Sequence, residues 1–114
     1  MIHYNVFDVV AVPFPYTDRN KSKKRPALVL ASLNTFDENL KQSVCAMITS
    51  AKNKPWPKDT YISDLESAGL PAESVVRLKL FTIDHHIISK KVGTLSPNDQ
   101  RGFKKNFGKV FSAL

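Results

Sequence analysis

Lys23-Lys24-Arg25-Pro26-Ala27-Leu28-Val29-Leu30 is the stretch on which the fold and its site are expected to depend. It joins a positively charged loop directly to a strand rich in branched apolar residues. A strand of that kind holds one end of the stretch rigid while the other end presents charge to solvent. Loop residues positioned by a rigid element behind them commonly form binding and catalytic sites.

The chain has 114 residues, of which 42% are hydrophobic, so it has room for a single core. We expect residues 1–114 to form one domain. No run approaches the roughly 18 apolar residues that a membrane helix needs, and no secretion signal is recognisable, which predicts a cytoplasmic protein. Cys45 lies in an apolar run without a second cysteine, and we interpret it as a core residue rather than a nucleophile.

The positive charge of the chain, +7 in total, is concentrated in two places. Five cations and no acid lie between Arg19 and Arg25, and six cations with Asp99 as the only acid lie between His85 and the end. Basic runs are often simply solvated surface. Two separate clusters on so small a domain nevertheless favour a nucleic-acid partner.

Apolar and alternating segments predict strands over residues 6–14, 27–33, 43–49, 59–62, 74–83 and 91–95. Turns, or one short helical turn in the first case, are expected over residues 34–40 and 64–70. The charged side of residues 74–83, with Arg77 and Lys79, is expected to face outward, and Gly93 allows a bulge. Short strands of this kind predict a small, mostly β barrel.

A C-terminal helix is expected after Ser96, which can cap it, with Pro97 in the first helical position and Asp99 near the positive end of the helix dipole. The apolar residues that then recur on one face are Phe103, Phe107, Val110, Phe111 and Leu114. This stripe predicts a helix packed against the barrel, which makes the fold α+β.

Two loops carry most of the candidate binding residues. Residues 16–24 form a long basic connection, suited to a flap that guides phosphates. Residues 51–58 are also basic and contain Trp56 between two prolines. The indole of Trp56 is suited to stacking on a nucleic-acid base or, alternatively, to covering the end of the barrel.

Several segments occur in an order that resembles a known family. They are Phe7-Asp8-Val9-Val10-Ala11-Val12-Pro13-Phe14, Lys24-Arg25-Pro26-Ala27-Leu28-Val29-Leu30, Ile48-Thr49-Ser50, Gly69-Leu70-Pro71-Ala72-Glu73-Ser74-Val75-Val76, Thr82-Ile83-Asp84 and Lys91-Val92-Gly93-Thr94-Leu95. Over nearly the whole chain, this series resembles the PemK/MazF toxins of type II toxin–antitoxin systems.

The resemblance implies an SH3-like, CcdB-like barrel, a homodimer, and cleavage of single-stranded RNA, including mRNA, without metal or cofactor. It implies that Arg25 and Thr49 are catalytic and that an acidic antitoxin covers the same region. The physical chemistry agrees, because a guanidinium gives bidentate hydrogen bonds to phosphate and keeps its charge. The residues expected to contact RNA are Arg19, Lys21, Lys23, Lys24, Ser50, Trp56, Asp84 and His85.

The chain also departs from the family pattern. Phe81 stands where many members carry an arginine, so a second phosphate-binding cation is missing. Phe7 replaces the usual glycine at the start of the first strand, which is expected to affect packing more than chemistry. His85 and His86 are either an acid or base or ordinary loop residues. Asp84 is expected to orient Arg25 or to cap a turn.

Two other functions remain open from the sequence. The chain is a candidate for a non-catalytic toxin that inhibits a protein such as DNA gyrase, as CcdB-like relatives of this fold do through C-terminal residues. It is also a candidate for an inactive module that binds RNA or antitoxin, given Phe81. The endoribonuclease is the leading hypothesis because of the Arg25 and Thr49 segments and the two basic clusters.

Overall fold

The computed structural model describes residues 3–13, 24–33 and 41–114. Its elements are β1(Asp8–Pro13), β2(Lys24–Leu33), β3(Gln42–Ser50), β4(Thr60–Tyr61), α1(Leu65–Ala68), β5(Ser74–Asp84), the 3-10 turn η2(His85–Ile87), β6(Lys90–Thr94) and α2(Pro97–Val110). The predicted turn at residues 34–40 and the flap residues Arg19, Lys21 and Lys23 lie outside the described residues. The six predicted strands and the C-terminal helix are present, which confirms a mostly β fold.

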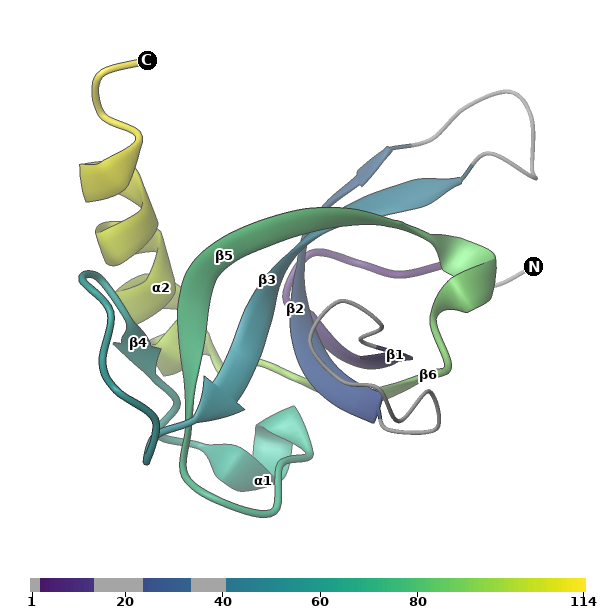
Figure 1. Ribbon diagram of the computed structural model, residues 1–114, viewed down its shortest axis with the longest axis horizontal. Helices are drawn as coiled ribbons and strands as arrows, with labels where there is room; N and C mark the ends of the chain where they lie inside the picture. Colours follow the sequence, from purple (N-terminus) through teal and green to yellow (C-terminus); the bar gives the residue numbers. More distant parts are fainter. Residues whose placement is uncertain (1–2, 14–23, 34–40) are drawn as a thin grey trace.

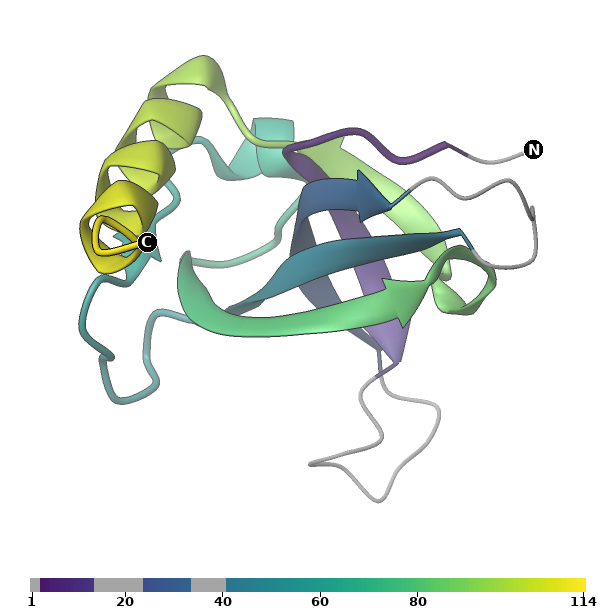
Figure 2. The same cartoon turned by 90° about the horizontal axis from the view of Figure 1, so that it is seen from above.

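The six strands form one antiparallel sheet in the order β4-β5-β3-β2-β1-β6. The sheet curls into a half-barrel, with α2 against β4 at one side (Figures 1 and 2). None of the helices in the described part of the chain is long and apolar enough to span a membrane.

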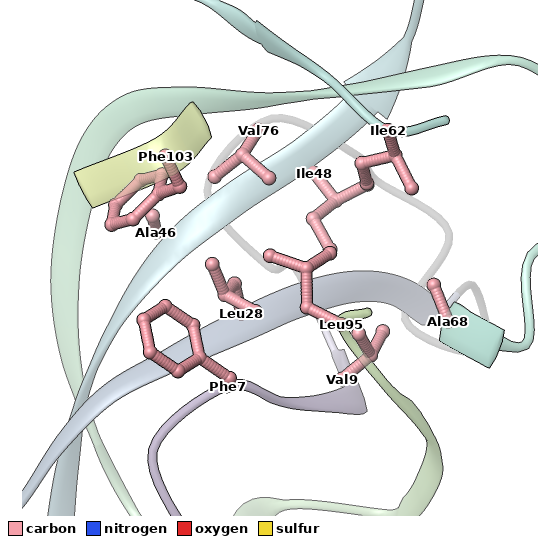
Figure 3. Close-up of a cluster of buried hydrophobic side chains, with 10 residues drawn as sticks. All are labelled: Phe7, Val9, Leu28, Ala46, Ile48, Ile62, Ala68, Val76, Leu95 and Phe103. Atoms are coloured by element: carbon pink, nitrogen blue, oxygen red, sulfur yellow. The ribbon is translucent and has the colours of Figure 1, made fainter. Parts of the chain in front are cut away.

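The principal core lies between the sheet and the two helices. Figure 3 shows Leu28, Ile48 and Leu95 near its centre, with Phe103 of α2 on one side and Ala68 of α1 on the other. The other members of this cluster are Phe7, Val9, Ala46, Ile62 and Val76. The core therefore joins strands from most of the sheet to both helices.

The opposite face of the central strands is buried as well. Val10, Ala27, Val29 and Cys45 belong to a second cluster, whose other members are Tyr4, Val12 and Ile88. Successive strand residues point to opposite faces, so two buried faces explain the uninterrupted apolar runs in the sequence. Cys45 is fully buried, and burial raises its pKa to about 12, which confirms its interpretation as a core residue.

Phe7 adopts a left-handed backbone conformation with φ of 73°. Its backbone bonds fix that conformation, because its N–H donates to the Val29 carbonyl at 2.8 Å and its carbonyl accepts from Leu95 N–H at 2.9 Å. Its ring lies edge-on to Phe103, with a centroid distance of 6.3 Å. Glycine adopts this conformation without strain, whereas Phe7 combines the strain with core packing.

We expect Phe7→Gly to be more stable than Phe7→Ala, by about 1 kcal/mol, although both lose the ring. A left-handed conformation costs a residue with a Cβ about 1 to 2 kcal/mol and costs glycine little, which outweighs the greater entropy of glycine in the unfolded chain. Urea unfolding of both variants measures the difference. Val12 is an ordinary strand position, so Val12→Ala should be more stable than Val12→Gly. If Phe7→Ala also proves more stable than Phe7→Gly, the explanation of the strain at Phe7 is contradicted.

The structure corrects one prediction about β5. Arg77 was expected to face outward, but it is buried, with 9% of its surface exposed, and pairs with Asp59. The loop before β4 explains the change, because Asp59 pairs with the Arg77 guanidinium and the Trp56 ring lies against it. β5 carries two extra residues between Arg77 and Leu80, an even number that leaves the alternation of faces unchanged, and Leu80 is exposed.

Residues expected to form a polar turn contain a short helix, α1, followed by Gly69 in the left-handed conformation with φ of 72°. The Asp64 carboxylate caps it by accepting from Ser67 N–H at 2.9 Å. The predicted bulge at Gly93 is present, since Val9 pairs with Gly93 and Val10 with Lys91, leaving Val92 extra.

Helix α2 starts as predicted, because Ser96 Oγ accepts from the N–H of Asp99 and Pro97 occupies the first turn. Its apolar stripe packs only in part. Phe103 is buried, but Val110 is 45% exposed and Leu114 is 99% exposed, so the prediction is wrong for the C-terminal end of the stripe. The last turns of α2 extend past the described strands of the sheet (Figure 1).

Asp99 connects α2 to the chain before α1. Its carboxylate accepts from the Ser63 N–H, the Ser63 hydroxyl at 2.6 Å and the Asp64 N–H at 3.0 Å. Burial alone would raise the pKa of Asp99, but these hydrogen bonds outweigh it and hold the pKa below its ordinary value. Asp99 therefore stays ionised and anchors the helix start.

Candidate active site

Arg25 and Thr49 lie at the same end of adjacent strands. Arg25 is the second residue of β2 and pairs with Val12 of β1. In the β2–β3 register Ala27 pairs with Met47, so extending the pairing by two residues sets Arg25 opposite Thr49. The sheet thus brings together a guanidinium and a hydroxyl from separate parts of the sequence.

A cavity of about 200 Å³ opens at this end of the sheet. Arg25, Thr49 and Ser50 line it together with Pro26 and Ile48. The opposite wall is formed by Leu70, Pro71, Ala72, Glu73 and Ser74, which connect α1 to β5. The predicted catalytic residues and one predicted RNA-binding residue, Ser50, therefore share one cavity.

The Thr49 hydroxyl is held by the loop that follows β3. Its Oγ1 accepts a hydrogen bond from the side-chain amide of Asn53 at 2.6 Å. Because that bond uses an acceptor position, the hydroxyl proton remains to be donated. Ser50 Oγ accepts from Lys52 N–H at 3.2 Å and is oriented in the same way.

Glu73 and Asn53 are residues to which the sequence assigned no role. Glu73 is exposed and lines the cavity, and its carbonyl accepts from the Ala51 N–H at 3.0 Å. Its place at the cavity follows from the pairing of the next residue, Ser74, with Ser50, which the sequence alone does not give. The cavity therefore combines a guanidinium, hydroxyls and a carboxylic acid side chain.

Asp84 and His85 lie elsewhere. In the β3–β5 ladder Asp84 pairs with Gln42, whereas Thr49 pairs with Val75, so seven residues of extended strand, roughly 23 Å, separate the two ends. The Asp84 carboxylate accepts from the Gln42 amide at 2.7 Å, and its side chain makes no capping bond to η2. The structure thus does not bring Asp84 together with Arg25.

His85 belongs to a polar cluster at that far end. Its Nε2 lies 2.6 Å from the buried Ser43 hydroxyl, and its ring lies edge-on to Tyr4. Burial is the largest influence on His85 and lowers its pKa, so the imidazole is neutral near pH 7. Its predicted contact with RNA stays a prediction.

Lys24, Trp56 and Phe81 are not among the residues that line this cavity. Lys24 precedes Arg25, is exposed, and donates to the Ser89 hydroxyl at 3.0 Å. Trp56 lies on the loop between β3 and β4. Phe81 pairs with Cys45 in the middle of the sheet and packs against the second core cluster. No group of three or more metal-binding side chains occurs within the described ranges.

A curled antiparallel sheet with an arginine and a threonine at one cavity defines a small β protein with a site suited to an anion. The family model described as PemK-like, MazF-like toxin of type II toxin-antitoxin system matches residues 5–111. The chain therefore belongs to this family, which confirms the resemblance seen in the sequence.

Solved structures show the same fold. The Mycobacterium tuberculosis toxin MazF-mt6 superposes with a TM-score of 0.68 at 19% identity, over 92% of this chain and 96% of that one. An endoribonuclease in complex with its cognate antitoxin, from a mycobacterial species, gives 0.70 at 12% identity over 98% of each chain. The MazE-MazF structure from Deinococcus radiodurans gives 0.67 at 14%, over 94% and 93%. A comparison with curated protein sequences finds no match.

Proposed function

We propose that this protein is an endoribonuclease toxin that cleaves single-stranded RNA without a metal ion. The observation that carries the proposal is the cavity shared by Arg25, Thr49 and Ser50 in a chain of the MazF family. The segments that resemble the family in sequence supply the residues that the sheet brings together at this cavity.

The proposed reaction uses the RNA's own nucleophile. The 2′-hydroxyl oxygen attacks the adjacent phosphorus, the bond from phosphorus to the 5′ oxygen breaks, and the products are a cyclic phosphate and a 5′-hydroxyl. Arg25 stabilises the negative charge that accumulates on the phosphate oxygens, and the Thr49 hydroxyl donates to one of them. Glu73 is the candidate to accept the 2′-hydroxyl proton, and water returns a proton to the leaving oxygen.

The proposed partners follow from the family and from charge. The exposed lysines around the cavity would attract the RNA backbone, and an acidic antitoxin would compete for the same surface. We propose that the toxin acts as a homodimer in the cytoplasm, where messenger RNA is available. One structural neighbour is described as an endoribonuclease in complex with its cognate antitoxin, and another as MazE-MazF.

Incubation with an unstructured RNA in EDTA, followed by mapping of both new ends, tests the proposed function. We expect cleavage without added metal, a cyclic phosphate or 3′-phosphate on the upstream fragment, and a 5′-hydroxyl on the downstream one. A requirement for Mg²⁺, or 5′-phosphate ends, would contradict attack by the 2′-hydroxyl. Absence of cleavage across many RNA sequences would instead support the inactive binding module.

A further inference from the structure

The loop of residues 51–59, between β3 and β4, is organised around one buried side chain. Arg77, on β5, donates to both carboxylate oxygens of Asp59, from Nε at 3.2 Å and from Nη2 at 2.9 Å. Nη2 also donates to the Lys54 carbonyl at 2.8 Å. A forked guanidinium is the side chain that can satisfy a carboxylate and a carbonyl together, so Arg77 fixes two points of the loop.

Trp56 is placed by the same network. The backbone N–H of Trp56 donates to Asp59 Oδ2 at 2.9 Å, and the Trp56 carbonyl accepts from the backbone N–H of Asp59 at 3.3 Å. Lys58, at φ of 65°, takes the left-handed position of the tight turn that this second bond closes. The turn therefore projects the indole from a fixed backbone.

The indole itself is supported on one side and accessible on another. The Arg77 guanidinium carbon lies 4.9 Å from the ring centroid, which is a cation–π contact. Trp56 nevertheless keeps 45% of its surface exposed. An aromatic ring with a cation beneath it and open surface remaining is suited to stacking on a flat partner.

We propose that Arg77 is a positioning residue for a base-stacking subsite, in which Trp56 receives one unpaired base of the RNA bound at Arg25 and Thr49. The inference rests on the proposed function and adds a second contact to it. In this proposal Arg77 contacts the protein and not the RNA. It fixes Trp56 and its loop before the RNA binds, so less conformational entropy is lost on binding.

Two observations favour RNA as the occupant of this subsite. The loop is positively charged, because the exposed residues Lys52, Lys54 and Lys58 flank the indole, and Asp59, its only acid, is neutralised by Arg77. The loop is also joined to the cavity through Asn53, which donates to the Thr49 hydroxyl at 2.6 Å. An RNA whose phosphate is bound at the cavity therefore has an adjacent positive surface that can contact the rest of its backbone.

Trp56 is the only tryptophan of the chain, so its fluorescence reports on this subsite alone. The titration uses the full chain with Arg25→Ala, in which the RNA stays intact, and a short single-stranded oligoribonucleotide. Stacking is expected to quench the indole emission. An abasic oligomer of the same length, which keeps the phosphates, should bind without quenching.

The variants separate positioning from charge. Trp56→Ala should weaken binding of the oligoribonucleotide about tenfold, and Trp56→Phe should restore most of it. Arg77→Lys keeps the positive charge but loses the fork, and we expect less quenching together with severalfold weaker binding. Arg101→Lys, the same substitution on the exposed side of α2, should change neither quenching nor affinity.

Equal quenching by the abasic and the base-bearing oligomers would overturn the proposal, as would quenching by a poly-glutamate peptide and not by RNA. Unchanged quenching in Arg77→Lys would remove Arg77 from the mechanism. If Arg77→Lys fails to fold by circular dichroism, the Trp56 variants and the abasic comparison still decide whether the subsite exists. Quenching by RNA together with absence of cleavage by the unsubstituted protein would support the subsite and contradict the proposed activity, so the two failures are distinguishable.

Discussion

Arg25→Ala is expected to lower the rate of metal-free RNA cleavage by about a thousandfold. Removal of one preorganised donor from a charged transition state costs about 10²- to 10³-fold, and loss of an arginine that neutralises a transferring phosphoryl group costs about 10³- to 10⁵-fold. Within the described part of the chain Arg25 is the only cation that lines the cavity, and Phe81, at the position where the resemblance implies an arginine, carries no charge. The loss should therefore be close to complete in an ordinary assay.

Three matched variants make the Arg25 measurement specific. Arg25→Lys keeps a point charge but not the bidentate geometry, so it should recover only part of the rate. Thr49→Val keeps the shape of the side chain and should cost about a hundredfold through loss of one hydroxyl donor. Lys24→Ala, one residue before Arg25, should act mainly on KM and on salt dependence. Wild-type rates in a folded Arg25→Ala protein would contradict the assignment of this cavity.

The parts of the fold that were predictable are those set by local patterns. Ser96, Pro97 and Asp99 define a helix start within four residues, and the structure has the predicted cap. The apolar runs defined the strands because both faces of the central sheet are buried, although β2 begins at Lys24, three residues before the predicted start. Pairing with β1 carries the strand past the apolar segment, through Arg25 and Pro26.

The predictions that were wrong or incomplete concern residues whose environment depends on contacts with residues far away in the sequence. Arg77 follows the strand alternation in sequence, but its burial depends on Asp59 and Trp56 from the loop before β4. The strain at Phe7 depends on bonds to Val29 and Leu95. Propensity and periodicity contain no information about such partners, which only the assembled sheet supplies.

The candidate site shows the same division. The order of the segments was enough to predict that Arg25 and Thr49 would act together, and the strand register sets them at one end of the sheet. Asp84 and His85 were grouped with them by position in the sequence, yet the antiparallel pairing of β3 and β5 sends them to the other end. Glu73 reaches the cavity because the next residue, Ser74, pairs with Ser50, which follows Thr49.

Gly93→Ala should destabilise the protein by about 3 kcal/mol and lower the Tm by roughly 10 to 20 °C. A Cβ at Gly93 would overlap the backbone of Ser67 and Ala68 in α1, and a Cβ at Gly69 would overlap the Val92 carbonyl in β6. The two backbones are in direct contact on both sides, so no flexible side chain can move to make room. Gly108→Ala is the matched control, because a Cβ there meets nothing within 4 Å and alanine favours the helix by about 0.5 to 1 kcal/mol.

The Gly93 contact also links the stability of the fold to the candidate site. Helix α1 leads through Gly69 into Leu70 and the other residues that form the far wall of the cavity. An alanine at position 93 that pushes α1 outward must move that wall, so the remaining folded protein should bind RNA less tightly at temperatures well below its Tm. Thermal unfolding and RNA affinity measured on the same sample test both effects. Loss of stability with unchanged affinity would show that α1 supports the core without positioning the site.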